Sequence, residues 1–151
     1  MLVKISIIDT SIPFEHRTCK EDAMKRLSEL VNNSAASHYY GESIERIFIG
    51  LIVVEPIYNK FAQPRRPRYT AHKEIVALGS IPMVFHKTLE IEIKLDYEQV
   101  LATDEEAFCR IVATKVLNTL RALKLPKKVT DFDKDKFVAD VESAFRTEHL
   151  I

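Results

Sequence analysis

The chain has 151 residues, of which 46% are hydrophobic and 29% are charged, and its 22 basic and 22 acidic side chains leave no formal net charge. This length and composition are typical of one globular domain, and they exclude a disordered or a fibrous chain. The neutral balance argues against a dedicated binder of nucleic acid or of an anionic membrane. The longest apolar run, 47–54, is far shorter than the roughly 20 residues that a membrane-spanning helix needs.

Few residues suit cofactor chemistry. The three glycines, Gly41, Gly50 and Gly79, are isolated from one another, which excludes phosphate-binding loops because these need several glycines within a few positions. Cys19 and Cys109 lie 90 positions apart and belong to no CxxC motif or histidine cluster, which argues against a disulfide framework and against a zinc site. The sequence therefore predicts no cofactor and no metal.

Strands and one helix alternate in the first third of the chain. Residues 2–8 alternate apolar and polar side chains and lack a signal-peptide cleavage site, so we expect a strand and a cytoplasmic protein. Thr18–Glu21 has the form of a capping box, which predicts a helix that ends at Asn32–Asn33. Residues 44–54 are apolar at both parities, which is typical of a central strand covered at least in part on both faces.

Two further strands follow a long connection that contains prolines. Residues 69–78 predict the third strand and residues 83–97 predict the fourth, which has the clearest alternation in the chain. From residue 88 to residue 97 its odd-numbered side chains are apolar, whereas its even-numbered side chains, among them Glu90 and Glu92, are polar and are expected to meet solvent. A slip of one residue would expose the whole apolar set, so the register is firmly specified.

Two helices complete the predicted elements. Thr103–Glu106 is a second capping box, and the helix that follows it is expected to end at Pro126. A third helix is expected to begin near Asp133, with Phe132 and Phe137 placed as a hydrophobic staple.

This order of elements predicts a single α+β domain over residues 1–151, with a mostly antiparallel four-stranded sheet and about three helices packed on one face. The apolar stripe of the fourth strand must be covered by the apolar stripes of the helices, which predicts one core. Its expected members are Val3, Ile5, Phe48, Leu89, Ile91, Ile93, Phe108, Val112, Val116 and Phe145.

Two groups of titratable residues are better explained by structure than by chemistry. Asp131, Asp133 and Asp135 are spaced as in a calcium loop, but Lys136 stands where that loop needs glycine, so we expect the acids to cap a helix. The histidines show no metal-ligand spacing, and no nucleophile elbow is present. We therefore expect no catalytic residues, although a catalytic group assembled from distant positions is an alternative. His72 and His86 are expected to form a solvated pair. The five histidines are His16, His38, His72, His86 and His149.

Charge gathers at two places that the core does not need. Residues 60–68 form the only local basic cluster, and the polar face of the fourth strand is acidic. Complementary charge sets encounter rate and partner choice, so we single out Glu90, Glu92, Arg65 and Arg66 as candidate partner-binding residues. The alternative interpretation is a solvated loop beside the ordinary polar face of an amphipathic strand.

The C-terminal half contains the run LEIEIKLDYEQVLATDEEAF, in which an amphipathic strand passes through KLDY into an acid-capped helix, followed by KVLNTLRALK and VTDFDKDKFVADVESAF. Over about residues 85–147 this pattern resembles a family of small bacterial immunity proteins, which neutralise toxins in polymorphic-toxin and contact-dependent growth inhibition systems. The N-terminal half is compatible with it as a β-α-β beginning. The resemblance implies a cytoplasmic protein without enzymatic activity that binds one cognate toxin domain and occludes its active site.

Two other classes stay open at this point. One is a small-molecule-binding or catalytic α+β domain with its site between sheet and helices. The other is a structural subunit of a larger complex that uses the exposed face of the sheet. A toxin gene directly upstream would favour the immunity protein over both.

Overall fold

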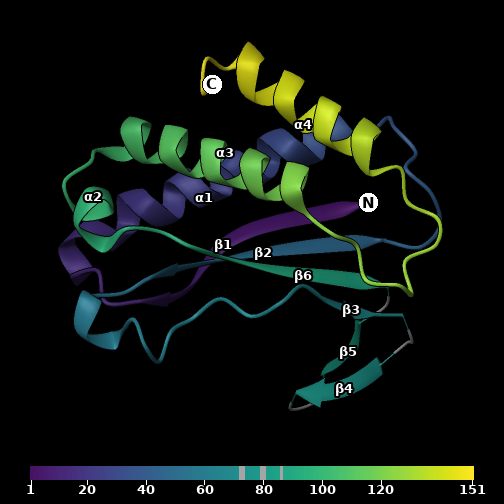
Figure 1. Ribbon diagram of the computed structural model, residues 1–151, viewed down its shortest axis with the longest axis horizontal. Coiled ribbons are helices and arrows are strands. Elements are labelled where there is room, and N and C mark those ends of the chain that lie inside the picture. The colour runs from purple at the N-terminus through teal and green to yellow at the C-terminus, as the bar shows by residue number, and fades with distance from the viewer. Residues whose placement is uncertain (72–73, 79–80, 86) are drawn as a thin grey trace.

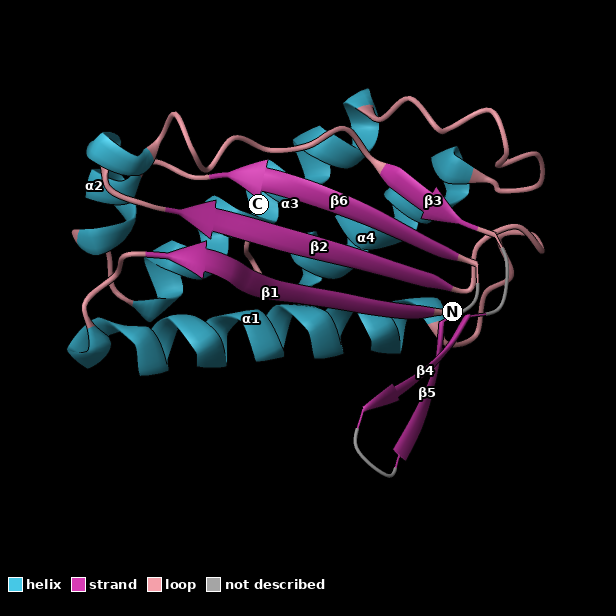
Figure 2. Ribbon diagram, turned by 90° about the horizontal axis from the view of Figure 1, so that it is seen from below, coloured by secondary structure: helices cyan, strands magenta, loops and turns pink. Residues whose placement is uncertain are grey.

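The computed structural model describes residues 1–71, 74–78, 81–85 and 87–151, and it describes the side chains of residues 1–71 and 87–151. A four-stranded sheet has the order β1 (Leu2–Thr10), β2 (Arg46–Val53), β6 (Thr88–Lys94) and β3 (Arg68–Thr70) (Figure 2). β1, β2 and β6 run parallel, and β3 runs antiparallel to β6. The remaining strands, β4 (Glu74–Leu78) and β5 (Ile81–Phe85), form a separate antiparallel hairpin.

The helices gather on one side of this sheet (Figure 1). α1 (Phe14–Ala35) packs on β1, and α3 (Glu105–Ala122) packs on β6. α4 (Lys134–Thr147) packs against both of these helices and forms an outer layer. Two short helices, η1 (Pro56–Tyr58) and α2 (Tyr97–Leu101), follow β2 and β6 respectively.

The prediction of a mostly antiparallel sheet with about three helices is wrong. The sheet is mixed and mostly parallel, and the described residues contain four α-helices. α1 returns the chain from the end of β1 to the start of β2, and a helical crossover of this kind joins parallel strands. The predicted third and fourth strands are each divided in two, and Lys87, with a φ of 46°, separates β5 from β6.

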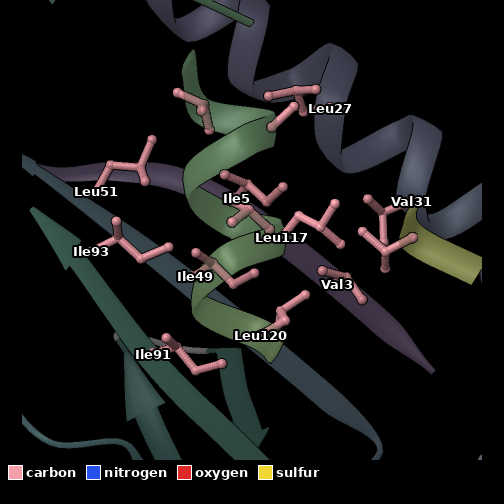
Figure 3. Packing of buried hydrophobic residues seen from close by; sticks show 14 of the residues in the cluster. Val3, Ile5, Leu27, Val31, Ile49, Leu51, Ile91, Ile93, Leu117 and Leu120 are labelled. Carbon is pink, nitrogen blue, oxygen red and sulfur yellow. The ribbon is translucent and has the colours of Figure 1, made fainter. Parts of the chain in front are cut away.

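Odd-numbered side chains of the parallel strands face α1 and α3 and form the core (Figure 3). Nine of the ten predicted core residues are confirmed in this cluster. Phe48 is the exception, because it lies at an even position of β2 and is only half-buried on the opposite face of the sheet. β2 is apolar at both parities, so its sequence alone did not show which set faces the helices. The nine confirmed residues are Val3, Ile5, Leu89, Ile91, Ile93, Phe108, Val112, Val116 and Phe145.

The predicted helix ends differ from the observed ones by a few residues. α1 begins at Phe14, ahead of the predicted capping box at Thr18, and α3 has Asp104 as its N-cap in place of the preceding threonine. The staple of α4 is confirmed, since the ring centroids of Phe132 and Phe137 lie 5.8 Å apart.

The outer edge of β1 is bonded to side chains of α1. Asn32 accepts a hydrogen bond from the backbone N–H of Val3 and donates one to the Val3 carbonyl, each 2.7 Å long. One turn earlier, the hydroxyl of Ser28 accepts from the N–H of Ile5 at 2.8 Å and donates its one proton to the Met24 carbonyl of its own helix at 2.8 Å. An unpaired strand edge is a template for pairing with another chain, so these two side chains close it. Asn32 therefore lies within α1 and does not end it as predicted.

The acidic residues before α4 hold backbone groups. Asp133 is the N-cap of α4 and accepts from the N–H of Lys136 at 3.1 Å, as predicted for a helix cap. Asp131 accepts from the N–H of Glu42 at 2.9 Å. This contact needs Gly41, whose φ is +119° and where an added Cβ would lie 2.4 Å from the Asp131 carbonyl oxygen.

Replacing Asn32 with alanine is expected to lower the free energy of unfolding by about 1–3 kcal/mol, because it leaves the N–H and carbonyl of Val3 without partners. Urea denaturation measures this change. The control is Asn33→Ala, since Asn33 is exposed and makes no side-chain hydrogen bond within the described residues. Equal midpoints for the two variants would contradict the edge-closing role of Asn32.

Replacing Asp133 with alanine is expected to cost about 1 kcal/mol through the lost helix cap. Because the Asp133 carboxylate caps α4, we do not expect it to bind calcium. A ligand raises the melting temperature only by binding the native state, so added calcium is expected to leave the melting temperature of the natural protein unchanged. Asp135→Ala is the control within the first turn of α4. If calcium raises the melting temperature and Asp133→Ala abolishes this increase, Asp133 is a calcium ligand and the capping role is wrong.

Candidate functional site

The face of the sheet opposite α1 and α3 carries no helix among the described residues (Figure 2). Even-numbered side chains of β2 and β6 point to this side, and residues 61–68 run beside the strands. Together they border a hollow of about 780 Å³. We call this surface the open face; it comprises Lys4, Ser6, Ile8, Phe48, Gly50, Ile52, Phe61, Ala62, Gln63, Arg65, Arg68, Glu90 and Glu92.

Local packing holds the floor and the rim of the hollow. Ile52, Val54 and Ala62 form a second small buried cluster, which fastens the segment after β2 to this side of the sheet. Ile8 lies directly over Gly50, where an added Cβ would meet its Cδ1 at 2.6 Å. Ile8 is the extra residue where the register of β1 against β2 shifts. Glycine at position 50 thus allows the bulged strand to lay an apolar side chain across its neighbour.

Two ion pairs cross the open face, and they join three of the four sequence-predicted residues. Arg65 and Glu92 are 2.8 Å apart at the closest, and the backbone N–H of Arg65 also donates to the Glu92 carboxylate at 2.6 Å. Glu90 pairs with Arg68 at 2.7 Å. From the sequence, the acidic and the basic residues were expected to lie on two surfaces and to bind a partner there. The structure places them against each other.

Glu92 is the more buried of the two acids, with 12% of its side chain exposed. Burial of the carboxylate raises its pKa, but the hydrogen bonds and the charge of Arg65 outweigh burial, so the pKa of Glu92 lies below its ordinary value. Arg65 and Glu92 therefore act as a clamp that holds residues 61–68 against β6.

The fourth predicted residue, Arg66, does not join this arrangement. It points to the other side of residues 61–68 and lines a separate hollow between the edge of the sheet and α3. Residues 61–68 are therefore a ridge with Arg65 on one flank and Arg66 on the other.

Apolar side chains also belong to the site, although none was among its predicted residues. Phe61 is 77% exposed and Ile8 is 52% exposed, and both line the hollow of the open face. Tyr58 is 51% exposed and shares a smaller adjoining hollow with Phe61. Phe61 lies within the basic cluster of residues 60–68, which was the available signal in the sequence. Aromatic residues of this exposure are enriched in protein–protein interfaces.

Three side chains that could take part in catalysis, a cysteine, a histidine and a lysine, are buried or are held in structural contacts. Burial raises the pKa of the Cys109 thiol, which makes it a poor nucleophile. His38 Nδ1 lies 3.0 Å from the Asp140 carboxylate and links the segment before β2 to α4. Lys20 is buried against α3 and donates to the carbonyl of Thr103. No three His, Cys, Asp or Glu side chains within the described residues are grouped to hold a metal ion. His72 and His86 lie outside the described residues.

None of the helices in the described part of the chain combines the length and the hydropathy needed to span a bilayer. A three-layer α+β fold that leaves one sheet face open, with charged and aromatic side chains on that face, defines a surface suited to binding another protein. The comparison with known families agrees with a protein-binding class, because the matching family consists of immunity proteins. The chain belongs to this family, Immunity protein 44, whose model matches residues 3–147.

The match extends the resemblance from the C-terminal half to nearly the whole chain, including β1 and α1. No curated protein matches the chain, and no solved structure does.

The Arg65–Glu92 clamp predicts a pH dependence. Since the folded-state pKa of Glu92 is lowered, its contribution to stability is complete above the unfolded value near 4.5 and is lost as pH falls through the folded value. The stability difference between the natural protein and Glu92→Gln is therefore expected to shrink on acidification, as urea denaturation at several pH values measures. Glu29→Gln is the control, because Glu29 is exposed and forms no ion pair with a described residue, and its stability is expected to stay within about 0.5 kcal/mol of the natural protein at neutral pH. A Glu92→Gln deficit that persists unchanged in acid would contradict the clamp.

Proposed function

We propose that this protein neutralises one cognate toxin domain in the cytoplasm by binding it stoichiometrically and occluding its active site. The observation that carries the proposal is the family match over residues 3–147. The toxin belongs to a polymorphic-toxin or contact-dependent growth inhibition system of a bacterium. The chain turns over no substrate of its own.

The open face is the proposed contact surface. Its exposed Phe61 and Ile8 provide the apolar anchors that dominate binding energy in many interfaces. The two ion pairs fix the surrounding charges in place before a partner arrives, which lowers the entropy cost of binding. Glu90, Glu92, Arg65 and Arg66 remain the proposed charged contact residues.

Replacing Phe61 with alanine is expected to weaken toxin binding by at least about tenfold, because an aromatic anchor typically contributes more than 1.4 kcal/mol. Titration calorimetry with the toxin domain encoded beside this chain measures the affinity, and survival of cells that express the toxin measures protection. The matched control is Phe14→Ala, since Phe14 is 80% exposed and lines neither hollow beside residues 61–68.

A second variant tests the charges without breaking the fold. Exchanging the Glu90–Arg68 pair, as Glu90→Arg with Arg68→Glu, keeps an ion pair but reverses its direction. Weaker binding at unchanged stability would support the open face as the contact surface. If Phe61→Ala and the exchanged pair both bind as the natural protein does, the contact surface is wrong. If the purified natural protein neither binds the neighbouring toxin nor protects cells, the proposed function is wrong.

A further inference from the structure

A second hollow, of about 950 Å³, lies at the edge of the sheet. It exists because β3 pairs only with residues 88–90 of β6, so no strand of the described residues covers the remainder of that edge. One wall is a stripe of α3 at helical spacing, and the other is the flank of residues 61–68 that carries Arg66. We call it the edge cleft; its lining includes Arg66, Pro67, Ile91, Lys115, Asn118 and Lys124.

The edge cleft is basic, and its cations are unpaired. Arg66, Lys115 and Lys124 are exposed, and none of them forms an ion pair with a described residue. The acid in the lining, Glu92, is held by Arg65 from the other side of the ridge.

Other basic side chains nearby are neutralised. Arg121 of α3 pairs with Glu142 at 2.8 Å, and Arg68 pairs with Glu90. Lys127 and Lys128 follow the end of α3 and add two more exposed cations that form no ion pair with a described residue. Five exposed cations that form no ion pair with a described residue therefore lie in the edge cleft or directly follow its lining in the chain, although the whole chain is neutral.

We propose that the edge cleft receives an acidic segment of the toxin domain. This inference rests on the proposed function and adds the chemistry of the partner surface. Three unpaired cations around a partly apolar floor fit carboxylates on a polypeptide, since charge complementarity governs which surfaces associate. No aromatic ring lines the described part of the cleft, so a nucleic acid finds no stacking platform there.

The edge cleft and the open face adjoin each other. Ile91 and Glu92 line both hollows, and Arg65 and Arg66 are neighbours on the ridge. A toxin domain that straddles the ridge thus places apolar groups near Phe61 and carboxylates near Lys115. It follows that the bound surface of the toxin is acidic and is not a strongly basic substrate groove.

Reversing single charges tests this inference. Lys115→Glu and Lys124→Glu are each expected to weaken binding of the neighbouring toxin domain by at least about tenfold, with the loss mainly in the association rate and smaller at high salt. The matched control is Lys25→Glu, because Lys25 is an exposed lysine of α1 that does not line the cleft, and this variant is expected to change the affinity by less than about twofold. Thermal unfolding of each variant verifies that the fold is retained.

The outcomes separate this inference from the proposed function. Binding by the natural protein with no difference between Lys115→Glu, Lys124→Glu and Lys25→Glu would overturn the acidic contact and leave the immunity function standing. No binding by the natural protein would overturn both.

A measurement without the toxin provides a second test. In an NMR titration, a hexaglutamate peptide is expected to shift the amide signals of Lys115, Asn118 and Lys124, and Lys115→Glu is expected to abolish these shifts. A hexalysine peptide is the control and is expected to leave them in place. Tighter binding of a short DNA duplex than of hexaglutamate at the same residues would overturn the assignment to an acidic protein in favour of nucleic acid.

Discussion

The arrangement of the whole molecule depends on how α1 meets β1. Asn32 bonds both the N–H and the carbonyl of Val3 on the outer edge of β1, and Ser28 accepts from the N–H of Ile5, so these side chains occupy the positions where a further strand would pair. The same helix returns the chain to the start of β2, so that β2 runs parallel to β1. Its Leu27 and Val31 cover the core face of the sheet. Because α1 and α3 pack side by side on that face, the opposite face of the sheet is left to residues 61–68 and carries no helix among the described residues.

The two flanks of residues 61–68 have different chemistry for a structural reason. Arg65 is drawn into the clamp with Glu92, and this contact orients the next residue, Arg66, toward α3. One flank therefore carries paired charges and an exposed aromatic ring, and the other carries unpaired cations. A protein of zero net charge thereby presents two distinct binding chemistries within one continuous surface.

Local signals in the sequence were sufficient for the parts of the fold that short-range physics decides. The alternation in residues 88–95 specified which side chains of β6 are buried, and Phe132 with Phe137 marked the start of α4 correctly. Strand direction was beyond these signals, because pairing β2 with β1 and β6 joins residues about forty positions apart. The both-parity apolar pattern of β2 was the available indication of a central parallel strand.

The sequence by itself determined the class of elements, most of the core and, through its C-terminal pattern, the family. Only the tertiary structure decided that Glu92 holds Arg65, that Phe48 lies on the open face, and that Arg66 shares a cleft with Lys115. These arrangements bring together segments that are distant in the chain, and their geometry follows from the parallel pairing of β1, β2 and β6. Charge along a chain shows how many ions a surface has, whereas the fold decides which of them neutralise each other and which stay available to a partner.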